Sequence, residues 1–396
     1  MTQQNHNRLE IKPLAESEVY RPWVKTHGSP LLLLDLHRLR QQYQKLIRAL
    51  PGVDLFFAIK SLPNSEVISA LDSFGCGFDI ATSGEAALLQ DAGVAARNAI
   101  HTHPVKRQQD IRDALRYGCT TFVVDNIWEL EKFIPYRHRV RLLLRVSFPN
   151  PESPINLSRK FGCQPDEVFF LLQRAVSLGI RIKGLSFHAG SQSPAPDNHV
   201  HAIEQCRLLM LEYTDTTGKL LPILDIGGGF PVQYGKVVPD IDSFCEPIRK
   251  ALGTLPDHIQ VIAEPGRFLS APAMTSVSTI MGKAKRSDAT WYYLDDGLYG
   301  AYSGQIFDYA TYPMTVFSDF PERETAVLAG PTCDSIDVIA ENLQLPPLQI
   351  GDLVVGSQMG AYTTATSTDF NLFPRAKIIT IDQILIQQQQ SESIAG

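Results

Sequence analysis

The stretch LFFAIKS (residues 55–61) joins five mostly apolar residues, typical of a buried strand, to a lysine at the point where the strand ends. A segment with helical spacing of its apolar positions, SEVISALDSF (65–74), follows it directly. Burial lowers the pKa of a lysine amine, which makes the amine a nucleophile able to form a Schiff base. A lone lysine past a strand is more often an ordinary surface residue. A functional role for Lys60 therefore depends on which other residues the chain places near it.

The same alternation of strand and helix continues along the chain. The strands that we predict are LFFAI (55–59), GFDIA (77–81), NAIHT (98–102), TTFVVD (120–125), RVRLLLRV (139–146), RIKGLSFH (181–188), PILDI (222–226) and IQVIA (259–263). Helical segments such as 83–93 and 165–179 separate them. Eight strands with helices between them predict a closed parallel (β/α)8 barrel of the TIM type.

After residue 269 the chain changes to strand-like runs with turn residues between them. The runs lie within 275–285, 290–300, 325–341, 352–363 and 376–386, and SPLLLLDL (29–36) is a further strand after a polar, proline-broken start. We therefore predict two domains. A barrel over residues 36–271 is joined to an all-β domain, sandwich- or barrel-like, of residues 1–35 and 272–396. The tail 387–396 is of low complexity and is expected to be frayed.

The composition is that of an ordinary globular protein. Of 396 residues, 44% are hydrophobic and 20% charged, and the net charge of -6 gives no reason to expect nucleic acid or an anionic membrane surface as a partner. Six scattered cysteines without a CxxC pair favour neither a zinc site nor a disulfide framework. The polar start has no apolar core of a signal peptide, and no run is long enough to span a membrane, so we expect a cytoplasmic protein.

Polar and glycine residues gather where the predicted strands end, which is the catalytic face of such barrels. They are Lys60, Asp79, Asp125, Arg145, His188, Gly227–Gly228–Gly229 and Glu264–Pro265–Gly266–Arg267. Glycine loops after the seventh and eighth strands let backbone N–H groups approach a phosphate, to which Arg267 adds charge. Glu264 beside a pyridine nitrogen would keep that nitrogen protonated. An equally good interpretation is a carboxylate neutralised by an arginine such as Arg145.

Two residues after the sixth strand have both a functional and an ordinary interpretation. His188, in SFHAGSQ, could stack on a flat cofactor ring, but a lone histidine is more often a core residue hydrogen-bonded to the backbone. Ser191 could donate to a phosphate or could cap a helix.

A cysteine and several acids in the second half have similar alternatives. Cys333, in AGPTCDSID, could donate a proton if it is exposed to a site, although most cysteines are inert. Acids in loops are usually solvated, but two of them pointing into one site would select a substrate with a distal ammonium group. The candidate acids are Asp308, Asp334 and Asp337.

Taken together, these motifs resemble the fold-type III, alanine-racemase-like family of pyridoxal-phosphate enzymes. Within that family they are most similar to the ornithine decarboxylase group of basic amino-acid decarboxylases. The resemblance runs from about residue 32 to residue 380, and its motifs are FFAIKS, FDIATSGE, SFHAGSQ, DIGGGFP, EPGR, DDGLYG, GPTCDSID and GAYT.

The resemblance implies that Lys60 holds pyridoxal 5′-phosphate as a Schiff base, that His188 stacks on its ring, and that Glu264 pairs with its pyridine nitrogen. The phosphate ligands that it implies are Ser191, Gly228, Gly229, Gly266, Arg267 and Tyr362. The residues that it places near the lysine and the ring are Asp79, Arg145 and the supporting Glu85.

The resemblance also implies a homodimer with active sites shared between the subunits. Cys333 and Asp334 would enter from the partner, with Cys333 protonating the α-carbon after carbon dioxide leaves. Asp308 and Asp334 would hold the distal amine, and Phe370 would border the substrate. The family's FNGF segment reads FNLF here (370–373), so Leu372 leaves the preference between ornithine and lysine open.

We therefore predict a pyridoxal-phosphate-dependent carboxy-lyase that converts L-ornithine to putrescine, with L-lysine to cadaverine as a second reaction, in polyamine biosynthesis. We expect no metal, nucleic-acid or membrane partner. Three alternatives remain. One is a decarboxylase of carboxynorspermidine or of diaminopimelate, whose second carboxylate Asp334 would repel. Another is a racemase, disfavoured because Glu264 makes the ring a full electron sink. The third is a catalytically inactive binding protein, for which loss of Lys60 or Cys333 would have been expected.

Overall fold

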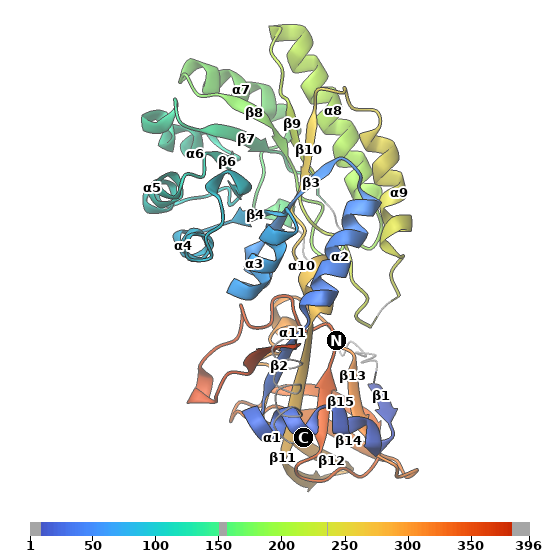
Figure 1. The fold of residues 1–396 in the computed structure, drawn as a ribbon. Coiled ribbons are helices and arrows are strands. Elements are labelled where there is room, and N and C mark those ends of the chain that lie inside the picture. The colour runs from blue at the N-terminus through green and yellow to red at the C-terminus, as the bar shows by residue number, and fades with distance from the viewer. Residues whose placement is uncertain (1–8, 150–156, 236, 382–396) are drawn as a thin grey trace, which may run out of the picture. The chain divides into compact units, whose positions relative to one another are not determined.

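The computed structural model describes residues 9–149, 157–235 and 237–381, which fall into two compact units (Figure 1). The barrel unit comprises Arg40–Pro231 and Val238–Leu269, and the β unit draws on Met1–Leu39, Val232–Val237 and Ser270–Gly396. The predicted fold class, a parallel barrel with an all-β domain, is confirmed. The tail expected to be frayed lies outside the described residues.

Parallel strands close the barrel in the order β10-β3-β4-β5-β6-β7-β8-β9. They are β3 (Val53–Ala58), β4 (Gly77–Ile80), β5 (Ala99–His101), β6 (Thr121–Val124), β7 (Arg141–Arg145), β8 (Ile182–Ser186), β9 (Ile223–Asp225) and β10 (Gln260–Ala263). Each overlaps one of the predicted strands. The barrel interior is filled by side chains from alternating strand positions, so it is a packed core rather than a channel. Its buried members are Ile100, Val123, Leu143 and Ile262.

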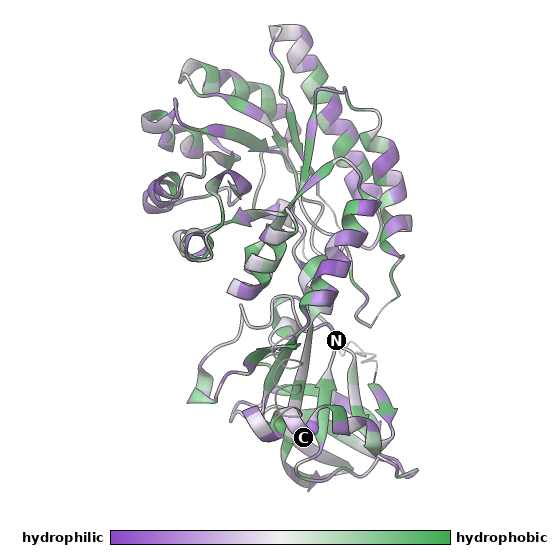
Figure 2. Ribbon diagram, in the orientation of Figure 1, coloured by the Kyte–Doolittle hydropathy of each residue, from purple (hydrophilic) through white to green (hydrophobic). Residues whose placement is uncertain are grey.

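Helices lie outside the ring of strands, as Figure 1 shows. They are α3 (Ser65–Ser73), α4 (Ser83–Asp91), α5 (Gln108–Tyr117), α6 (Ile127–Lys132), α7 (Val168–Ser177), α8 (Asp197–Thr217) and α9 (Ile241–Leu252), and α2 (Leu36–Ala49) precedes β3. Several begin at a side-chain cap: Asn64, Thr82, Asn126 and Asp240 each accept hydrogen bonds from N–H groups of the first turn. Both hydrophobic and hydrophilic residues occur along α2, α8 and α9 (Figure 2), as expected of helices with one face on a barrel.

The β unit has a nine-stranded sheet in the order β1-β13-β16-β11-β12-β14-β15, with β2 pairing β11 and β17. Its strands are β1 (Leu9–Lys12), β2 (Leu31–Leu34), β11 (Met274–Arg286), β12 (Ala289–Leu294), β13 (Met314–Phe317), β14 (Glu324–Ala329), β15 (Val338–Leu345), β16 (Leu353–Gly356) and β17 (Lys377–Thr380). Because β1 pairs β13 and β2 pairs β11, the N-terminal segment does complete this domain, as predicted.

Two parts of the β unit differ from the prediction. The polar start was not expected to be regular, but it forms β1, η1 (Leu14–Val19) and α1 (Arg21–His27). The runs 290–300 and 352–363 were predicted as strands throughout, yet β12 ends at Leu294 and β16 at Gly356. Their glycine-containing second halves form turns, and these turns carry Tyr299 and Tyr362.

Among the described residues, no helix has both the length and the apolar character needed to cross a membrane.

Candidate active site

Lys60 forms an ion pair at the carboxyl end of the barrel strands. It lies in η2 (Ile59–Ser61), directly after β3, and its Nζ is 2.5 Å from Oδ2 of Asp79 on the neighbouring strand β4. The side chain of Asp79 is fully buried and also accepts a hydrogen bond from the Thr102 hydroxyl. The Lys60 side chain is 41% exposed. The amine is therefore paired with a buried carboxylate while its side chain stays partly accessible, and the predicted role of Lys60 stays a prediction.

Glu264 follows β10, and its carboxyl group is hydrogen-bonded to that of Asp225. Burial, and next the negative charge of Asp225, raise the pKa of the Glu264 carboxyl well above its ordinary value. The two carboxyl groups share a hydrogen bond, in which the protonated Glu264 is the donor. Asp225 is held in place from its own side, where it accepts from the Gly227 N–H at 2.9 Å and from the Ser186 hydroxyl at 3.2 Å. A carboxyl group with a raised pKa holds its proton more readily, and in that form it is a hydrogen-bond donor.

Arg145 does not neutralise Glu264 directly. No ion pair joins these two side chains in the described part of the chain, and the Arg145 guanidinium lies 5.6 Å from the centre of the Phe161 ring. The interpretation of Glu264 as a carboxylate paired with Arg145 is therefore wrong. Arg145 is nevertheless buried close enough to Glu264, Asp225 and Asp79 for their charges to act on it.

His188 is a neutral imidazole at this rim. Burial, and then the positive charges of Arg145 and Lys60, lower the pKa of its ring well below the ordinary value. Nδ1 accepts a hydrogen bond from the Gly190 N–H at 3.0 Å, which leaves the ring proton on Nε2. A neutral flat ring suits stacking on a cofactor, and the backbone bond is the one that the ordinary interpretation expected.

The glycines after β9 and β10 allow close packing of neighbouring loops. A Cβ on Gly228 would lie 2.6 Å from the Glu264 carbonyl oxygen and 3.2 Å from His188 Nε2. A Cβ on Gly266 would lie 3.1 Å from the Cβ of Ser61, beside Lys60. A side chain at Gly228 would clash with the backbone at Glu264 and push the loops apart, whereas one at Gly266 would press tightly on Ser61 beside the lysine.

Arg267 and Ser191 are brought together although they lie far apart in the sequence. The Arg267 side chain donates to the Ser191 Oγ at 3.2 Å through Nη2 and at 3.4 Å through Nε. Arg267 is 5% exposed. A buried guanidinium beside a hydroxyl is a suitable set of donors for a phosphate. The predicted roles of Ser191, Arg267, Gly228, Gly229 and Gly266 in phosphate binding stay predictions.

Glu85 supports the loop beside Asp79. Its Oε2 accepts from the Ala81 N–H at 2.5 Å, while the Thr82 hydroxyl oxygen accepts from the Glu85 N–H at 3.3 Å. The Thr82 hydroxyl therefore caps the start of α4, and the Glu85 carboxyl reaches back to the backbone of the residue before this cap. Burial raises the pKa of Glu85 to about 7, so this carboxyl also titrates near neutrality.

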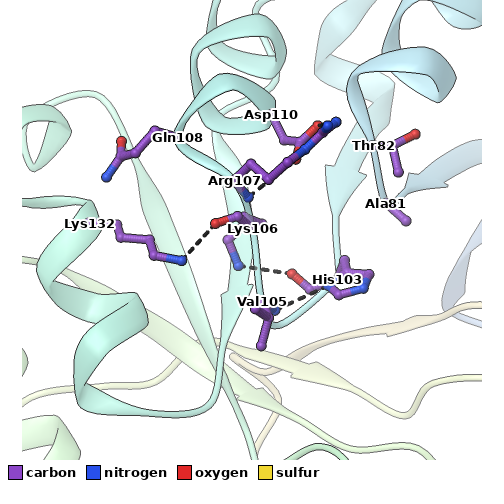
Figure 3. A pocket seen from close by; sticks show the side chains of 9 residues that line it. All are labelled: Ala81, Thr82, His103, Val105, Lys106, Arg107, Gln108, Asp110 and Lys132. Atoms are coloured by element: carbon purple, nitrogen blue, oxygen red, sulfur yellow. Dashed lines mark hydrogen bonds and ion pairs between the residues drawn. The ribbon is translucent and has the colours of Figure 1, made fainter.

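A cavity of about 530 Å³ opens beside the loops that follow β4 and β5 (Figure 3). Its lining residues are Ala81, Thr82, His103, Val105, Lys106, Arg107, Gln108, Asp110 and Lys132. Its buried cation, Lys106, donates to the carbonyl oxygens of His103, Pro104 and Val123 at 2.6–2.9 Å. An ammonium group has three N–H donors, so Lys106 holds this loop together and is not a nucleophile for the cofactor.

The β unit brings a second group of predicted residues together. Cys333 is exposed, whereas the other five cysteines are buried. The neighbouring Asp334 accepts a hydrogen bond from the Tyr299 hydroxyl, which lowers the pKa of this carboxyl. The Tyr299 ring stacks on Phe370 with centroids 4.6 Å apart and planes at 26°. Cys333, Asp334 and Phe370 therefore form one cluster, which Tyr299 joins.

The remaining predicted residues of the β unit have different surroundings. Asp337 is buried and structural, since its carboxylate accepts from the N–H groups of Leu298 and Thr332 at 2.7 and 3.0 Å. Asp308 directly follows α11 (Gly304–Phe307) and is partly exposed. Tyr362 lies in a turn after β16 with φ of 55°, a left-handed backbone. The predicted roles of Asp308 and Tyr362 stay predictions.

Sequence reasoning missed several polar residues that contact the predicted ones: Thr102, Ser186, Asp225, Tyr299 and Asn371. For Asp225 a signal was present, because an acid ends the apolar strand PILDI. The other four residues contact segments that are distant in the sequence and become neighbours only in the folded protein, so the sequence pattern gives no signal for them.

Comparisons with known proteins show to which family the chain is similar. The family model described as pyridoxal-dependent decarboxylase, pyridoxal binding domain, matches residues 36–271. The chain is 34% identical over 370 residues to lysine/ornithine decarboxylase of Selenomonas ruminantium, covering 93% of each chain. It is 33% identical over 362 residues to antizyme inhibitor 2 of Xenopus laevis, covering 87% of this chain and 79% of that one. Among solved structures, lysine/ornithine decarboxylase from Vibrio vulnificus complexed with cadaverine superposes with a TM-score of 0.89 at 52% identity, over 92% of this chain and 96% of that chain.

Proposed function

The chain belongs to the family of pyridoxal-dependent decarboxylases, and we propose that it removes the α-carboxyl group of a basic L-amino acid. The proposed main reaction converts L-ornithine to putrescine, and the proposed second reaction converts L-lysine to cadaverine. We further propose that residues 36–271 bind the cofactor, that residues 1–35 and 272–396 form the second domain, and that the enzyme works in the cytoplasm.

One observation carries this proposal: the accessible amine of Lys60 lies against Asp79, within the electrostatic reach of a Glu264 carboxyl that keeps its proton. Pyridoxal 5′-phosphate combines an aldehyde, a pyridine nitrogen and a phosphate. The barrel unit offers an amine for the first, a protonated carboxyl for the second, and the Arg267–Ser191 pair for the third. The residues present therefore fit the cofactor.

When bound, the cofactor supplies a carbonyl that condenses with amines and a ring that accepts the electron pair left by departing carbon dioxide. Lys60 would hold the carbonyl carbon of the cofactor, and Asp79 orients the Lys60 amine through their ion pair. Glu264 would face the ring nitrogen as a hydrogen-bond donor, because burial and the nearby charge of Asp225 raise the pKa of its carboxyl. His188, being neutral, offers a flat face without adding a positive charge.

The β-unit cluster supplies the other half of the proposed chemistry. Exposed Cys333 protonates the α-carbon once carbon dioxide has left, and Asp334 with Asp308 binds the distal ammonium group. Phe370 borders the methylene chain of the substrate. We propose that this cluster enters the site of a second copy of the chain in a homodimer. Large exposed apolar side chains elsewhere in the β unit support an interface: Phe307, Tyr309 and Ile336.

The choice between ornithine and lysine depends on a single methylene, which is worth roughly 1–3 kcal/mol in an apolar pocket. The relatives include enzymes named for both substrates, which supports activity on both. Diaminopimelate carries a carboxylate at its far end, and this group would meet the ionised Asp334. A racemase is disfavoured, since the proton on Glu264 favours a full electron sink.

The test is a panel of kcat/KM values for L-ornithine, L-lysine, L-arginine and meso-diaminopimelate with added pyridoxal 5′-phosphate. Released carbon dioxide and the diamine product are both measured. We expect turnover of ornithine and lysine, and none of diaminopimelate. A protein that takes up the cofactor but releases carbon dioxide from none of the four amino acids would refute the proposal.

A second candidate is a binding protein of the same fold, which the similarity to antizyme inhibitor 2 favours. Retention of Lys60, Glu264 and Cys333 argues against it, because a pure binding role needs none of these groups. The absorbance spectrum after mixing with pyridoxal 5′-phosphate separates the candidates: the enzyme binds the aldehyde at Lys60 and changes the spectrum, whereas a protein that does not use Lys60 leaves it unchanged.

A further inference from the structure

We infer that Asn371 is a positioning residue for the proposed proton donor Cys333. Its side-chain Oδ1 accepts a hydrogen bond from the backbone N–H of Cys333 at 3.0 Å, across 38 positions of sequence. The inference rests on the proposed function, since it assigns to Asn371 the control of where the Cys333 thiol points.

Phe370 and Asn371, which are adjacent in the sequence, contact the Cys333–Asp334 segment by different routes. Asn371 binds the backbone of Cys333, while the ring of Phe370 stacks on Tyr299, whose hydroxyl donates to Asp334. Cys333 is thus held through its backbone N–H, whereas Asp334 is held through its side-chain carboxylate. Loss of the Asn371 contact would release Cys333 and leave Asp334 held.

The backbone conformation at residues 371 and 372 orients the side-chain amide of Asn371. Asn371 has φ of 55° and ψ of 7°, a left-handed conformation that asparagine tolerates better than most residues. Leu372 follows with φ of 56°, and its N–H donates to the Asp369 carbonyl at 3.0 Å. Two successive left-handed residues other than glycine are costly, so contacts such as the Asn371 bond and the Phe370 stack must maintain them.

The hydrogen bond fixes the thiol because Cys333 has one rotatable bond between its Cα and its sulfur. With the N–H held, the main chain at Cys333 has less freedom to move, so the sulfur position depends chiefly on φ and the side-chain rotamer. Cys333 is exposed, so no surrounding core restrains it instead. Proton transfer to carbon requires donor and acceptor in a narrow geometry, and a displacement of about 1 Å costs up to roughly 100-fold in rate.

The test compares Asn371→Gly, Asn371→Asp and Asn342→Gly with the full-length wild-type protein. Glycine removes the amide while accepting the left-handed backbone, and aspartate keeps an acceptor oxygen. Asn342 is an exposed asparagine in β15 with φ of 56°, so Asn342→Gly controls for the backbone change alone. We expect Asn371→Gly to lower kcat by about 10-fold or more with KM changed by less than about twofold. Asn371→Asp should recover most of the loss, and Asn342→Gly should match the wild type.

Amide hydrogen exchange at Cys333 supplies a reading that does not depend on activity. Exchange should become faster in Asn371→Gly than in the other three proteins, since only that variant loses the acceptor. Faster exchange with an unchanged kcat would overturn the positioning role while leaving the decarboxylase function intact. Unchanged exchange would overturn the hydrogen bond itself. Failure of the proposed function is separate, because the wild-type protein would then be inactive while the exchange result still stood.

Discussion

The carboxyl groups of Asp225 and Glu264 share a hydrogen bond at the ends of the adjacent strands β9 and β10. Both side chains are buried, and burial raises the pKa of each above its ordinary value. Each acid disfavours ionisation of the other, and the shared hydrogen bond raises the pKa of Glu264 while it lowers that of Asp225, so Glu264 is the donor of the pair. The barrel thereby stores a proton donor at the site proposed for a pyridine nitrogen.

Replacing Asp225 with asparagine should lower the pKa of Glu264. The negative charge that disfavours ionisation of Glu264 disappears, while the side-chain oxygen that accepts from Gly227 is retained. We expect the carbonyl-stretch band of a protonated carboxylic acid to titrate at lower pH in cofactor-free Asp225→Asn than in the wild type. Glu264→Gln, measured in parallel, should lack this band. An unchanged titration in Asp225→Asn would show that burial alone sets the pKa.

Lys60 should be irreplaceable for chemistry and partly replaceable for stability. Lys60→Ala and Lys60→Arg should each lower decarboxylation of every basic amino acid by at least about 10³-fold, since the covalent step is lost. An arginine is never deprotonated and so cannot act as the nucleophile, but it can still pair with the buried Asp79. Thermal melting of the cofactor-free proteins should therefore place Lys60→Arg above Lys60→Ala. Full turnover in either variant would contradict the assignment of Lys60.

The ring of strands could be predicted from the sequence because each parallel strand is a short apolar run that ends in a polar or glycine residue. The β1–β13 pairing could not, since LEIK is too short to show alternation and its stability comes from the pairing itself. Lys60 shows a related limit. An apolar strand predicts burial of the residues before Lys60, but exposure of the lysine depends on the shape of the barrel mouth.

The second site cluster illustrates what a linear sequence does not contain. The motif GPTCDSID indicates Cys333 and Asp334. The segment FNLF is singled out because Leu372 stands where the family has a glycine. That Asn371, one residue earlier, binds the Cys333 backbone follows only from the folded positions of two loops. Asp337 shows the reverse case, since an acid that could have selected substrate instead accepts backbone N–H groups in the interior.

Leu372→Gly should stabilise the protein. Leu372 is 84% exposed with φ of 56°, so it gains little from packing and strains the backbone. Left-handed geometry costs roughly 1–2 kcal/mol in a non-glycine residue, and glycine loses about 0.5–1 kcal/mol through added freedom in the unfolded chain. A net gain of about 0.5–1 kcal/mol in the free energy of unfolding is expected, measured by urea unfolding.

Ser287→Gly is the matched control for Leu372→Gly, because Ser287 is exposed with φ of 47° in the turn between β11 and β12. It should give a similar gain. If Ser287→Gly stabilises the protein and Leu372→Gly destabilises it, then contacts of the leucine side chain outweigh the backbone strain.

Stability should fall as pH rises through the titration of Glu85. The pKa of this carboxyl is raised by burial from 4.5 to about 7 in the folded protein. Between those values the folded state binds a proton that the unfolded state lacks, so the free energy of unfolding decreases with rising pH and levels off above about 7. Glu85→Gln cannot titrate, yet its amide oxygen can still accept from the Ala81 N–H. The wild type should therefore lose about 1–2 kcal/mol more than Glu85→Gln between pH ~5 and ~8, a figure reduced for the partial exposure of the side chain. Urea midpoints of both cofactor-free proteins measure this difference. The other carboxyl groups titrate alike in both, so parallel stability curves would mean that Glu85 is already ionised at the lower pH.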